Sequence, residues 1–351
     1  MGRIAIIGLG LIGGSVGLAL KRVEPENTTV VGYDARREVI GRAQRAGVID
    51  ETAMSVEHAV RGATMVVVAT PIIAMRRVFR DMAPYLQDKC VVTDTASTKA
   101  DVMKWAQQEL PPHVYFVGGH PMAGREKAGL QEAEAELFDE RPYCIVPSVD
   151  AVGGAVNALV GLVQAMGGKP FFLDADEHDA YVAAISHVPL LSSVALFNLA
   201  RRSNAWPELA NISGPAFKDL TRLASGEPEL GHDIFVTNRE NVLHWLQRYM
   251  AELQRISDLI ESKEEEETLF RALAEARIER EQFMEKLPER VNNKLAVEMP
   301  KASEAFMSMM TGALWQERAK EAEEALKERR RDDVGEEARL RKQLIEENED
   351  D

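Results

Sequence analysis

Short apolar runs recur along roughly the first 170 residues, and helical segments separate them. Almost every position in these runs is apolar, which is typical of strands covered on both faces of a sheet. Strands that alternate with helices form a mainly parallel sheet wrapped by helices. We therefore predict an α/β domain over residues 1–173. Its expected strands are Arg3–Ile7, Thr29–Tyr33, Met65–Ala69, Val91–Asp94, Val114–Val117, Tyr143–Val146 and Pro170–Leu173.

The pattern changes after Asp174, where the strand-length runs stop and apolar residues adopt helical spacing. The segment Ala180–Leu199 is rich in Ala, Leu and Val, which predicts a helix buried in a core or an interface. Helical spacing also marks Asn238–Ile260 and Leu269–Leu287. We predict an all-helical second domain over residues 174–287.

Charged residues dominate the remaining segment, residues 288–351, which predicts a solvated helix, a short coiled coil or a disordered tail. The formal net charge of the chain is −15, and residues 261–351 contribute −9 of it. An acidic chain is a poor partner for nucleic acid, because phosphate binding requires a basic surface.

Membrane and secretion signals are not evident in the sequence. The longest apolar runs are of strand length, well short of the roughly 20 residues that span a bilayer. Cys90 and Cys144 lie in apolar, strand-like runs, so we expect buried free thiols rather than a disulfide framework. We therefore expect a cytoplasmic protein without a membrane anchor.

The first predicted strand leads into a glycine-rich turn in which Gly8, Gly10 and Gly13 form a GxGxxG motif. In dinucleotide-binding proteins the first glycine permits a tight turn, the second admits the pyrophosphate, and the third lets the helix pack on the strand. The helix that starts near Leu11 and Ile12 would present its free N–H groups to the phosphates. The motif alone is weak evidence, but its position between a strand and a helix predicts a dinucleotide site.

A carboxylate follows the second strand at Asp34, 21 residues after Gly13. Such a carboxylate accepts hydrogen bonds from the adenosine ribose hydroxyls, and it favours NAD because it repels a 2′-phosphate. Arg36 and Arg37 leave NADP open, since arginines can pair with that phosphate. Thr70 follows the third long strand, where it either contacts the nicotinamide half or belongs to a turn held by Pro71.

Two further polar stretches, Asp94–Lys99 and Gly118–Glu126, follow predicted strands. In open α/β sheets, ligands bind at the carboxyl ends of the strands, so both stretches should face the cofactor crevice. His120 lies in the second stretch, in what we interpret as a glycine-rich turn, and a histidine can act as a base near neutral pH. Oxidation of an alcohol requires such a base. We expect no metal site.

The helical domain offers two further candidates. His187 lies at the start of an apolar helix, where a histidine is either a core residue or a ligand contact. Lys218 and Arg222 supply cations, and a guanidinium can hold a carboxylate through two parallel hydrogen bonds. The alternative for this pair is a surface ion pair.

These motifs together resemble the TyrA family, the prephenate and arogenate dehydrogenases of tyrosine biosynthesis. The similar stretches occur in the order of the family and cover residues 1 to about 287. The stretch Gly118–Gly124, with sequence GGHPMAG, is the most specific of them. The others are Gly8–Ser15, Asp94–Lys99, Ser186–Pro189, Phe217–Ala224, Asp233–Phe235 and Asn238–Asn241.

The resemblance implies a Rossmann-like N-terminal domain and an all-α C-terminal domain that forms a homodimer. It implies oxidative decarboxylation of prephenate to 4-hydroxyphenylpyruvate with reduction of NAD+. His120 would accept the proton of the ring hydroxyl, and Ser97 would orient His120 near that hydroxyl and the cofactor. Arg222 would hold a substrate carboxylate, assisted by His187 and Lys218, and Glu126 would line the entrance. Tyrosine resembles the product and would inhibit at the same site.

Two positions depart from the pattern of the family. Many members carry a second histidine where this chain has Leu190, and an aromatic residue where it has Leu230–His232. Both positions border the side-chain end of the substrate in the family, so arogenate remains an alternative substrate. Two remoter alternatives are a β-hydroxyacid dehydrogenase, which relies on a lysine in its helical domain, and a catalytically silent NAD-binding sensor that recruits partners through its tail.

Overall fold

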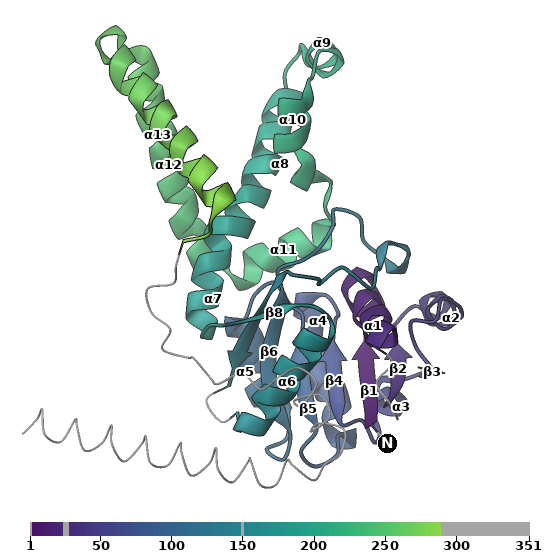
Figure 1. Cartoon of the computed structure of the whole chain (residues 1–351). Helices are drawn as coiled ribbons and strands as arrows, with labels where there is room; N and C mark the ends of the chain where they lie inside the picture. Colours follow the sequence, from purple (N-terminus) through teal and green to yellow (C-terminus); the bar gives the residue numbers. More distant parts are fainter. Residues whose placement is uncertain (1, 24–27, 149–150, 289–351) are drawn as a thin grey trace, which may run out of the picture. The chain divides into compact units, whose positions relative to one another are not determined.

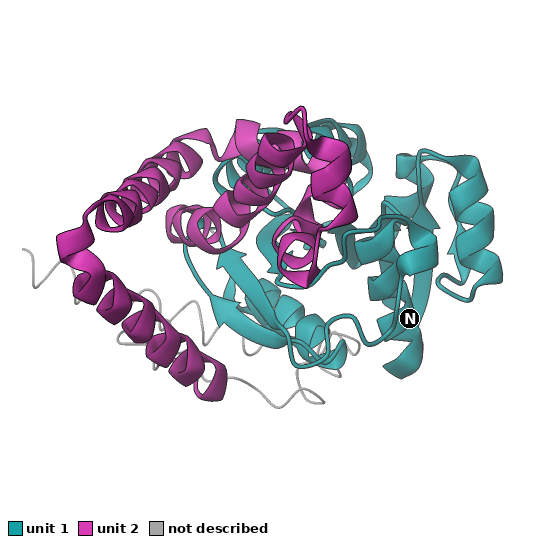
Figure 2. Ribbon diagram, turned by 90° about the horizontal axis from the view of Figure 1, so that it is seen from above, with its two compact units in different colours: residues 1–175, 300–351 teal, residues 176–299 magenta. Residues whose placement is uncertain are grey.

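The computed structural model describes residues 2–23, 28–148 and 151–288 of the chain. These residues divide into two compact units, one ending at Ala175 and one beginning at Asp176 (Figure 2). The charged extension predicted over residues 288–351 lies, from residue 289 onward, outside the described residues.

The first unit is built on an eight-stranded sheet with strand order β3-β2-β1-β4-β5-β6-β7-β8 (Figure 1). All neighbouring strands are parallel except β6 and β7. The prediction of a mainly parallel sheet is confirmed, and the short β3 is an addition to it. The strands are β1 (Gly2–Ile7), β2 (Thr28–Tyr33), β3 (Glu51–Thr52), β4 (Met65–Val68), β5 (Val91–Asp94), β6 (Tyr115–Pro121), β7 (Pro142–Pro147) and β8 (Lys169–Phe172).

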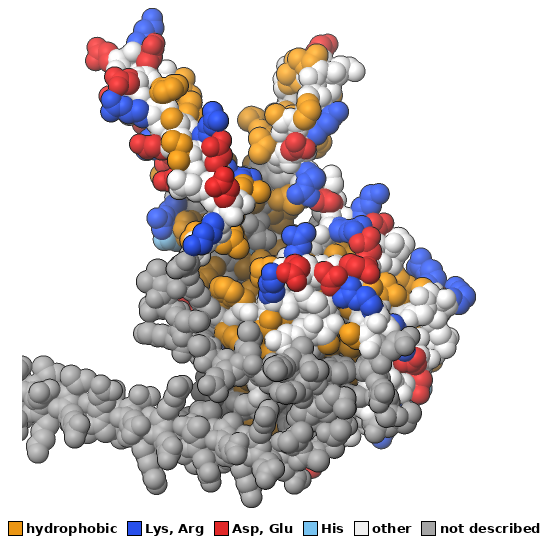
Figure 3. Space-filling view, in the orientation of Figure 1, with side chains coloured by type: hydrophobic (Ala, Val, Ile, Leu, Met, Phe, Trp, Pro, Cys, Tyr) orange, Lys and Arg blue, Asp and Glu red, His pale blue; other side chains and the backbone are white. Residues whose placement is uncertain are grey.

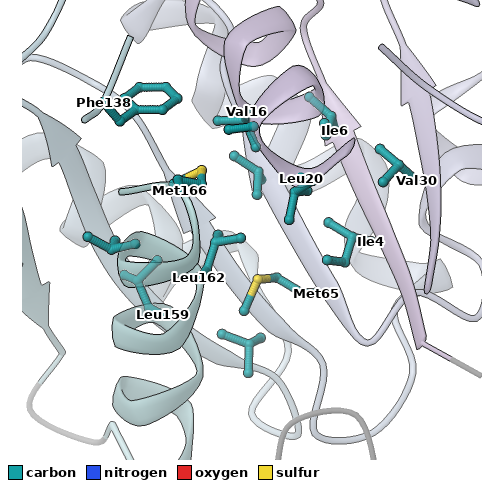
Figure 4. Close-up of a cluster of buried hydrophobic side chains, with 14 of the residues drawn as sticks. Ile4, Ile6, Val16, Leu20, Val30, Met65, Phe138, Leu159, Leu162 and Met166 are labelled. Carbon is teal, nitrogen blue, oxygen red and sulfur yellow. The ribbon is translucent and has the colours of Figure 1, made fainter. Parts of the chain in front are cut away.

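Helices cover both faces of this sheet. They are α1 (Leu11–Val23), α2 (Arg37–Arg45), α3 (Val56–Val60), α4 (Ile72–Met82), α5 (Ala100–Glu109) and α6 (Gly153–Ala165). Side chains of α1 and α6 meet those of β1 in one buried cluster (Figure 4). On the other face, Phe79 of α4 packs edge-on against Phe116 of β6, with ring centroids 5.5 Å apart. Alternate residues of each strand therefore serve two cores.

The structure corrects one expectation at β6. We expected the strand to end at Val117 and the following glycines to form a turn, yet Gly118–Pro121 continue the strand. Pairing with β5 ends at Val117, whereas antiparallel pairing with β7 continues and places His120 opposite Cys144. The glycines lie in a strand because a neighbouring main chain and side chains fill the space beside them.

The second unit contains only helices among its described residues. They are α7 (Ala175–Val182), α8 (Val188–Arg201), α9 (Trp206–Asn211), α10 (Pro215–Leu220), α11 (Pro228–Thr237), α12 (Arg239–Glu261) and α13 (Glu266–Glu285). The prediction of an all-helical unit is confirmed. A π-helical turn, Ala183–His187, joins α7 to α8, and a 3₁₀ turn, Lys263–Glu265, joins α12 to α13.

The continuous helical segment Ala175–Arg201 has the length and apolar composition of a membrane-spanning helix, the one such segment in the described part of the chain. This finding corrects our expectation that no apolar run approaches that length. Composition alone is weak evidence, because a core or interface helix meets the same criteria. Most of its apolar side chains are buried or half-buried within the chain, although Ile185 and Leu199 are 69% and 74% exposed.

Candidate active site

Steric crowding explains two of the three glycines in the turn between β1 and α1. Gly8 has a φ of 98°, and a Cβ there would lie 2.4 Å from the carbonyl oxygen of Ala69. A Cβ on Gly13 would lie 1.9 Å from the carbonyl oxygen of Gly8. Gly10 differs, because no atom lies within 4 Å of its Cβ position. The turn is therefore tightly packed at Gly8 and Gly13 and open at Gly10, where a pyrophosphate needs access to the backbone.

Asp34 is held in place by the turn that it would serve. Its carboxylate accepts hydrogen bonds from the Leu9 N–H, at 2.9 Å, and from the Arg36 N–H, at 2.9 Å. The Arg36 guanidinium also approaches the same carboxylate, with Nε 3.4 Å from Oδ1. The carboxylate is thus fixed beside the glycine turn, and Arg36 is directed toward it.

Four predicted site segments lie at one edge of the sheet. Strands β1, β4, β5 and β6 are mutually parallel, so their carboxyl ends share that edge. The glycine turn follows β1, Thr70 follows β4, Ser97 follows β5, and His120 lies near the end of β6. The Thr70 backbone nitrogen borders Gly8, whereas the Thr70 hydroxyl contacts the carbonyl oxygen of Pro71 at 3.4 Å.

A buried ion pair joins the loop that carries Ser97 to the strand that carries His120. The ammonium of Lys99 donates to the Asp94 carboxylate and, at 2.8 Å, to the carbonyl oxygen of Gly119. Asp94 also accepts from the N–H groups of Ala96, at 2.8 Å, and Gly119, at 3.0 Å. Both charged side chains are fully buried.

His120 itself is buried, at 7% exposure. The phenol of Tyr143 packs beside the preceding residue, Gly119, where its Cε1 atom would lie 3.0 Å from an added Cβ. Burial, together with the nearby charge of Asp94, raises the pKa of Tyr143, so the phenol stays neutral. Ser97 and Glu126 are both half-buried, in the loop after β5 and in the connection between β6 and β7.

In the second unit, Asn238 orients the ring of His187. The Asn238 amide donates to the Asp179 carbonyl oxygen at 2.7 Å and lies 3.2 Å from His187 Nδ1. Its own oxygen accepts from Asn241 at 2.8 Å, which fixes the orientation of the amide. Because the amide N–H donates, Nδ1 of neutral His187 accepts and the ring proton lies on Nε2.

Lys218 and Arg222 are exposed in the second unit. Arg222 opens a 3₁₀ turn, Arg222–Ser225, that is tied to α8 because the Ala224 N–H donates to the Ser193 hydroxyl at 3.0 Å. Helix α10 begins at Pro215, and Lys218 lies in its last turn. The two cations therefore sit in ordered helical turns.

The two departures from the family pattern meet in the structure. A Cβ on Gly231 would lie 3.7 Å from the Leu190 side chain, an ordinary van der Waals distance. The neighbouring His232 is exposed and contacts Asp233, with Nδ1 3.3 Å from Oδ1. Leu190 and the segment Leu230–His232, the two places at which the chain departs from the family pattern, are therefore neighbours in the structure.

Sequence reasoning did not assign roles to Asp94, Lys99 or Asn238. Asp94 ends an apolar strand, where a buried charge needs a partner, but nothing in the polar stretch that follows marks Lys99 as that partner. Nothing in the local sequence links Asn238 to His187, 51 residues away. Among the described residues, no three His, Cys, Asp or Glu side chains cluster to hold a metal ion.

Two family models match the chain in succession. The model described as prephenate dehydrogenase, nucleotide-binding domain, matches residues 16–171. The model described as prephenate dehydrogenase, dimerization domain, matches residues 174–275.

Similar proteins carry related names. A prephenate dehydrogenase of Bacillus subtilis is 33% identical over 270 residues, 76% of this chain and 72% of the relative. The crystal structure of a prephenate dehydrogenase from A. aeolicus, in complex with hydroxyphenyl propionate and NAD+, is 29% identical with a TM-score of 0.74. The match covers 81% of this chain and 98% of that one. A Synechocystis arogenate dehydrogenase is 27% identical with a TM-score of 0.68, over 80% of this chain and 99% of that one.

The matches cover both units of the chain in the order that the motifs predict. The chain therefore belongs to the prephenate dehydrogenase family, the TyrA family that its sequence resembles.

Proposed function

We propose that the protein is an NAD-dependent prephenate dehydrogenase that converts prephenate to 4-hydroxyphenylpyruvate and CO2. The observation that supports this proposal best is the shared edge of the sheet, where the glycine turn, Ser97 and His120 follow parallel strands. The family membership of the chain and the names of its relatives support the same reaction.

The first unit has the features that NAD requires. Gly8, Gly10, Leu11, Ile12 and Gly13 form a turn and helix start open to a pyrophosphate, and the fixed Asp34 carboxylate suits a ribose 2′-hydroxyl. Bound there, NAD+ supplies a hydride acceptor. Thr70 and Ser97 belong to the loops that would border its nicotinamide half.

In the proposed reaction, the side chains of the protein carry out the proton transfers. His120 takes the proton from the ring hydroxyl as the C4 hydrogen leaves as hydride, and the C4–O bond becomes a carbonyl. The bond from C1 to the ring carboxylate then breaks, and its electron pair passes through the ring to that oxygen. His120 returns the proton, which yields the phenol and CO2. Ser97 orients His120 and the hydroxyl during both transfers.

The second unit would supply the groups that recognise the substrate. Arg222 holds a carboxylate, His187 donates through Nε2, and Lys218 borders the entrance. Glu126, a residue of the first unit, also borders the entrance. The names of similar proteins support the keto acid prephenate as substrate, and we retain the amino acid arogenate as the alternative substrate.

We also propose that the enzyme is a cytoplasmic homodimer and that tyrosine inhibits it at the active site. Exposed apolar side chains on α12 and α13 support a second copy as partner, among them Leu253, Ile260, Phe270 and Leu273. Figure 3 shows apolar side chains on this helix pair. Leu246, Tyr249, Leu253, Ile256 and Ile260 of α12 are three and four residues apart, which is typical of a helix that packs along another helix.

The test is to mix purified protein with NAD+ and either prephenate or arogenate, and to follow NADH by absorbance. We expect turnover with prephenate, and loss of roughly 10³-fold or more in kcat for His120→Asn with NAD+ binding retained. Turnover with arogenate alone would keep the mechanism and change the substrate. Absence of NADH with both substrates, despite bound NAD+, would refute the proposed function.

A further inference from the structure

The buried ion pair between Asp94 and Lys99 joins two segments that carry the proposed chemistry. Asp94 ends β5, Ser97 lies in the loop after it, and Lys99 precedes α5. Gly119 directly precedes His120 on β6. The carboxylate and the ammonium bond to each other, the carboxylate accepts from the Ala96 N–H of this loop, and both charged groups bond to the backbone of Gly119.

The pair also continues the hydrogen bonding of β6 beyond the end of β5. Pairing between the two strands stops at Val117, two residues before Gly119. At Gly119 the N–H donates to Asp94 at 3.0 Å, and the carbonyl oxygen accepts from Lys99 at 2.8 Å. The two side chains therefore take the hydrogen-bonding role that a further residue of β5 would have. They fix the backbone of Gly119, and with it the direction of the His120 side chain.

The glycines before His120 make room for this arrangement. A Cβ on Gly118 would lie 3.3 Å from Cδ of Lys99 and 2.9 Å from the sulfur of Met103. A Cβ on Gly119 would lie 2.6 Å from the carbonyl oxygen of Asp94. A side chain at Gly118 would therefore crowd both Met103 and Lys99, and one at Gly119 would meet the main chain of Asp94.

Stability alone does not account for a fully buried ion pair. Removing two charges from water is unfavourable, and apolar residues of similar volume often stabilise a fold equally well. What such a pair provides is a defined geometry between the segments that it joins, which hydrophobic contacts specify less sharply.

We propose that Asp94 and Lys99 are positioning residues that set the distance and orientation between Ser97 and His120. This inference rests on the proposed function, in which those two residues act on the substrate hydroxyl. Neither Asp94 nor Lys99 contacts the reacting atoms in this proposal, and both act through the backbone of Gly119 and the loop after β5.

The main test is the paired variant Asp94→Asn with Lys99→Met, which retains volume and leaves no unpaired charge in the interior. We expect kcat to fall about 10²-fold, as for small misplacements of a catalytic group. The Kd for NAD+ should remain within about threefold of the wild-type value, because the glycine turn and Asp34 are untouched, and KM should change little. A matched control removes the ion pair between Arg22 and Asp139, at the far end of α1, as Arg22→Met with Asp139→Asn. This control should retain the wild-type kcat.

A second variant guards against failure of the first to fold. Gly118→Ala crowds Lys99, together with Met103 and the Val146 carbonyl, without removing a charge, and we expect it to lower kcat about tenfold with NAD+ affinity retained. A wild-type kcat in either folded variant would overturn the inference. The proposed function is tested separately, by wild-type turnover and by the His120→Asn variant. If the wild-type enzyme is active, His120→Asn is inactive and the paired variant keeps the wild-type kcat, then only the positioning role is refuted.

Discussion

The two units differ in where they keep their apolar side chains. In the first unit most large apolar residues of the described strands and helices are buried beside the sheet, and Val23, Ile73 and Phe171 are exposed exceptions. In the second unit many are exposed, with Ile212 80%, Phe270 72% and Leu273 62% accessible. The first unit therefore buries most of its apolar side chains within one chain, whereas the second exposes an apolar surface of the kind that binds a partner.

The largest effect is expected from a charge placed in the exposed apolar surface of α12 in the second unit. Leu253→Glu places a charge in the middle of the exposed apolar row on α12. Burying an unpaired charge costs several kcal/mol, so we expect the dimer dissociation constant to rise by about 10³-fold. Sedimentation velocity over a range of concentrations measures this change. Gln247→Glu, an exposed polar position on the same helix, should leave the dimer intact, and a wild-type protein that is monomeric would contradict the comparison.

The next effect contrasts leucine truncations in the two units. Leu159 of α6 is fully buried, so Leu159→Ala should lower the free energy of unfolding by about 3 kcal/mol, whatever the protein concentration. Leu199 of α8 is mostly exposed, so Leu199→Ala in the dissociated Leu253→Glu protein should change that free energy by less than about 0.5 kcal/mol. Urea unfolding of each variant measures both values. Equal losses in the two units would mean that the second unit buries Leu199 within its own chain.

A smaller effect is expected on the cofactor preference of the first unit, through the Asp34 carboxylate. Asp34→Asn preserves the shape of the side chain and removes the charge that opposes a 2′-phosphate. We expect the preference for NAD+ over NADP+ to narrow by about tenfold, because like charges brought together are unfavourable. The ratio of kcat/KM for the two cofactors measures it, and Glu38→Gln, an exposed acid at the start of α2, is the control. An unchanged ratio would remove Asp34 from cofactor discrimination.

The smallest expected effect concerns the ion pairs that tie α4 to α5. Hydrogen bonds from Arg80 and Arg76 lower the pKa of Glu109 from its usual 4.5 to about 2. Because the folded pKa is the lower one, this stabilisation is complete above pH 4.5 and is lost as the pH falls toward 2. Glu109→Gln should lower Tm by about 1 °C at pH 7, and the difference should vanish near pH 2. A difference that persists in acid would exclude this ion pair as its cause.

The sequence predicts the first unit well because strand and helix periods are local. Seven of its strands and the glycine turn follow from apolar runs and residue spacing, and only the two-residue β3 escapes that signal. The antiparallel β7 and the strand conformation of Gly118–Pro121 were not predictable, because both depend on pairing with residues far along the chain. Long-range partners decide whether a glycine pair lies in a turn or a strand.

The sequence also predicts the candidate site residues, but not the residues that orient them. Motif spacing predicts Gly8, Gly10, Gly13 and Asp34. Placement predicts His120 and the cations of the second unit, and the family resemblance assigns the role of Ser97. The partners that orient these residues escape sequence analysis, since the contact of Asn238 with His187 joins residues 51 positions apart. The ion pair of Asp94 and Lys99 is close in sequence, yet its link to Gly119 exists only in the folded sheet.

The π-helical turn Ala183–His187 affects how this chain tolerates changes in length. A π turn equals an α-helical turn with one extra residue, and each residue of an α-helix advances the side chains by about 100°. Loss of one residue within the turn would restore an α-helix and leave the faces of α8 (Val188–Arg201) where they are. The same loss within α8 would rotate every later side chain of that helix away from its contacts. Single-residue deletions should therefore accumulate at this turn among relatives of the chain and be absent from the helices on either side of it.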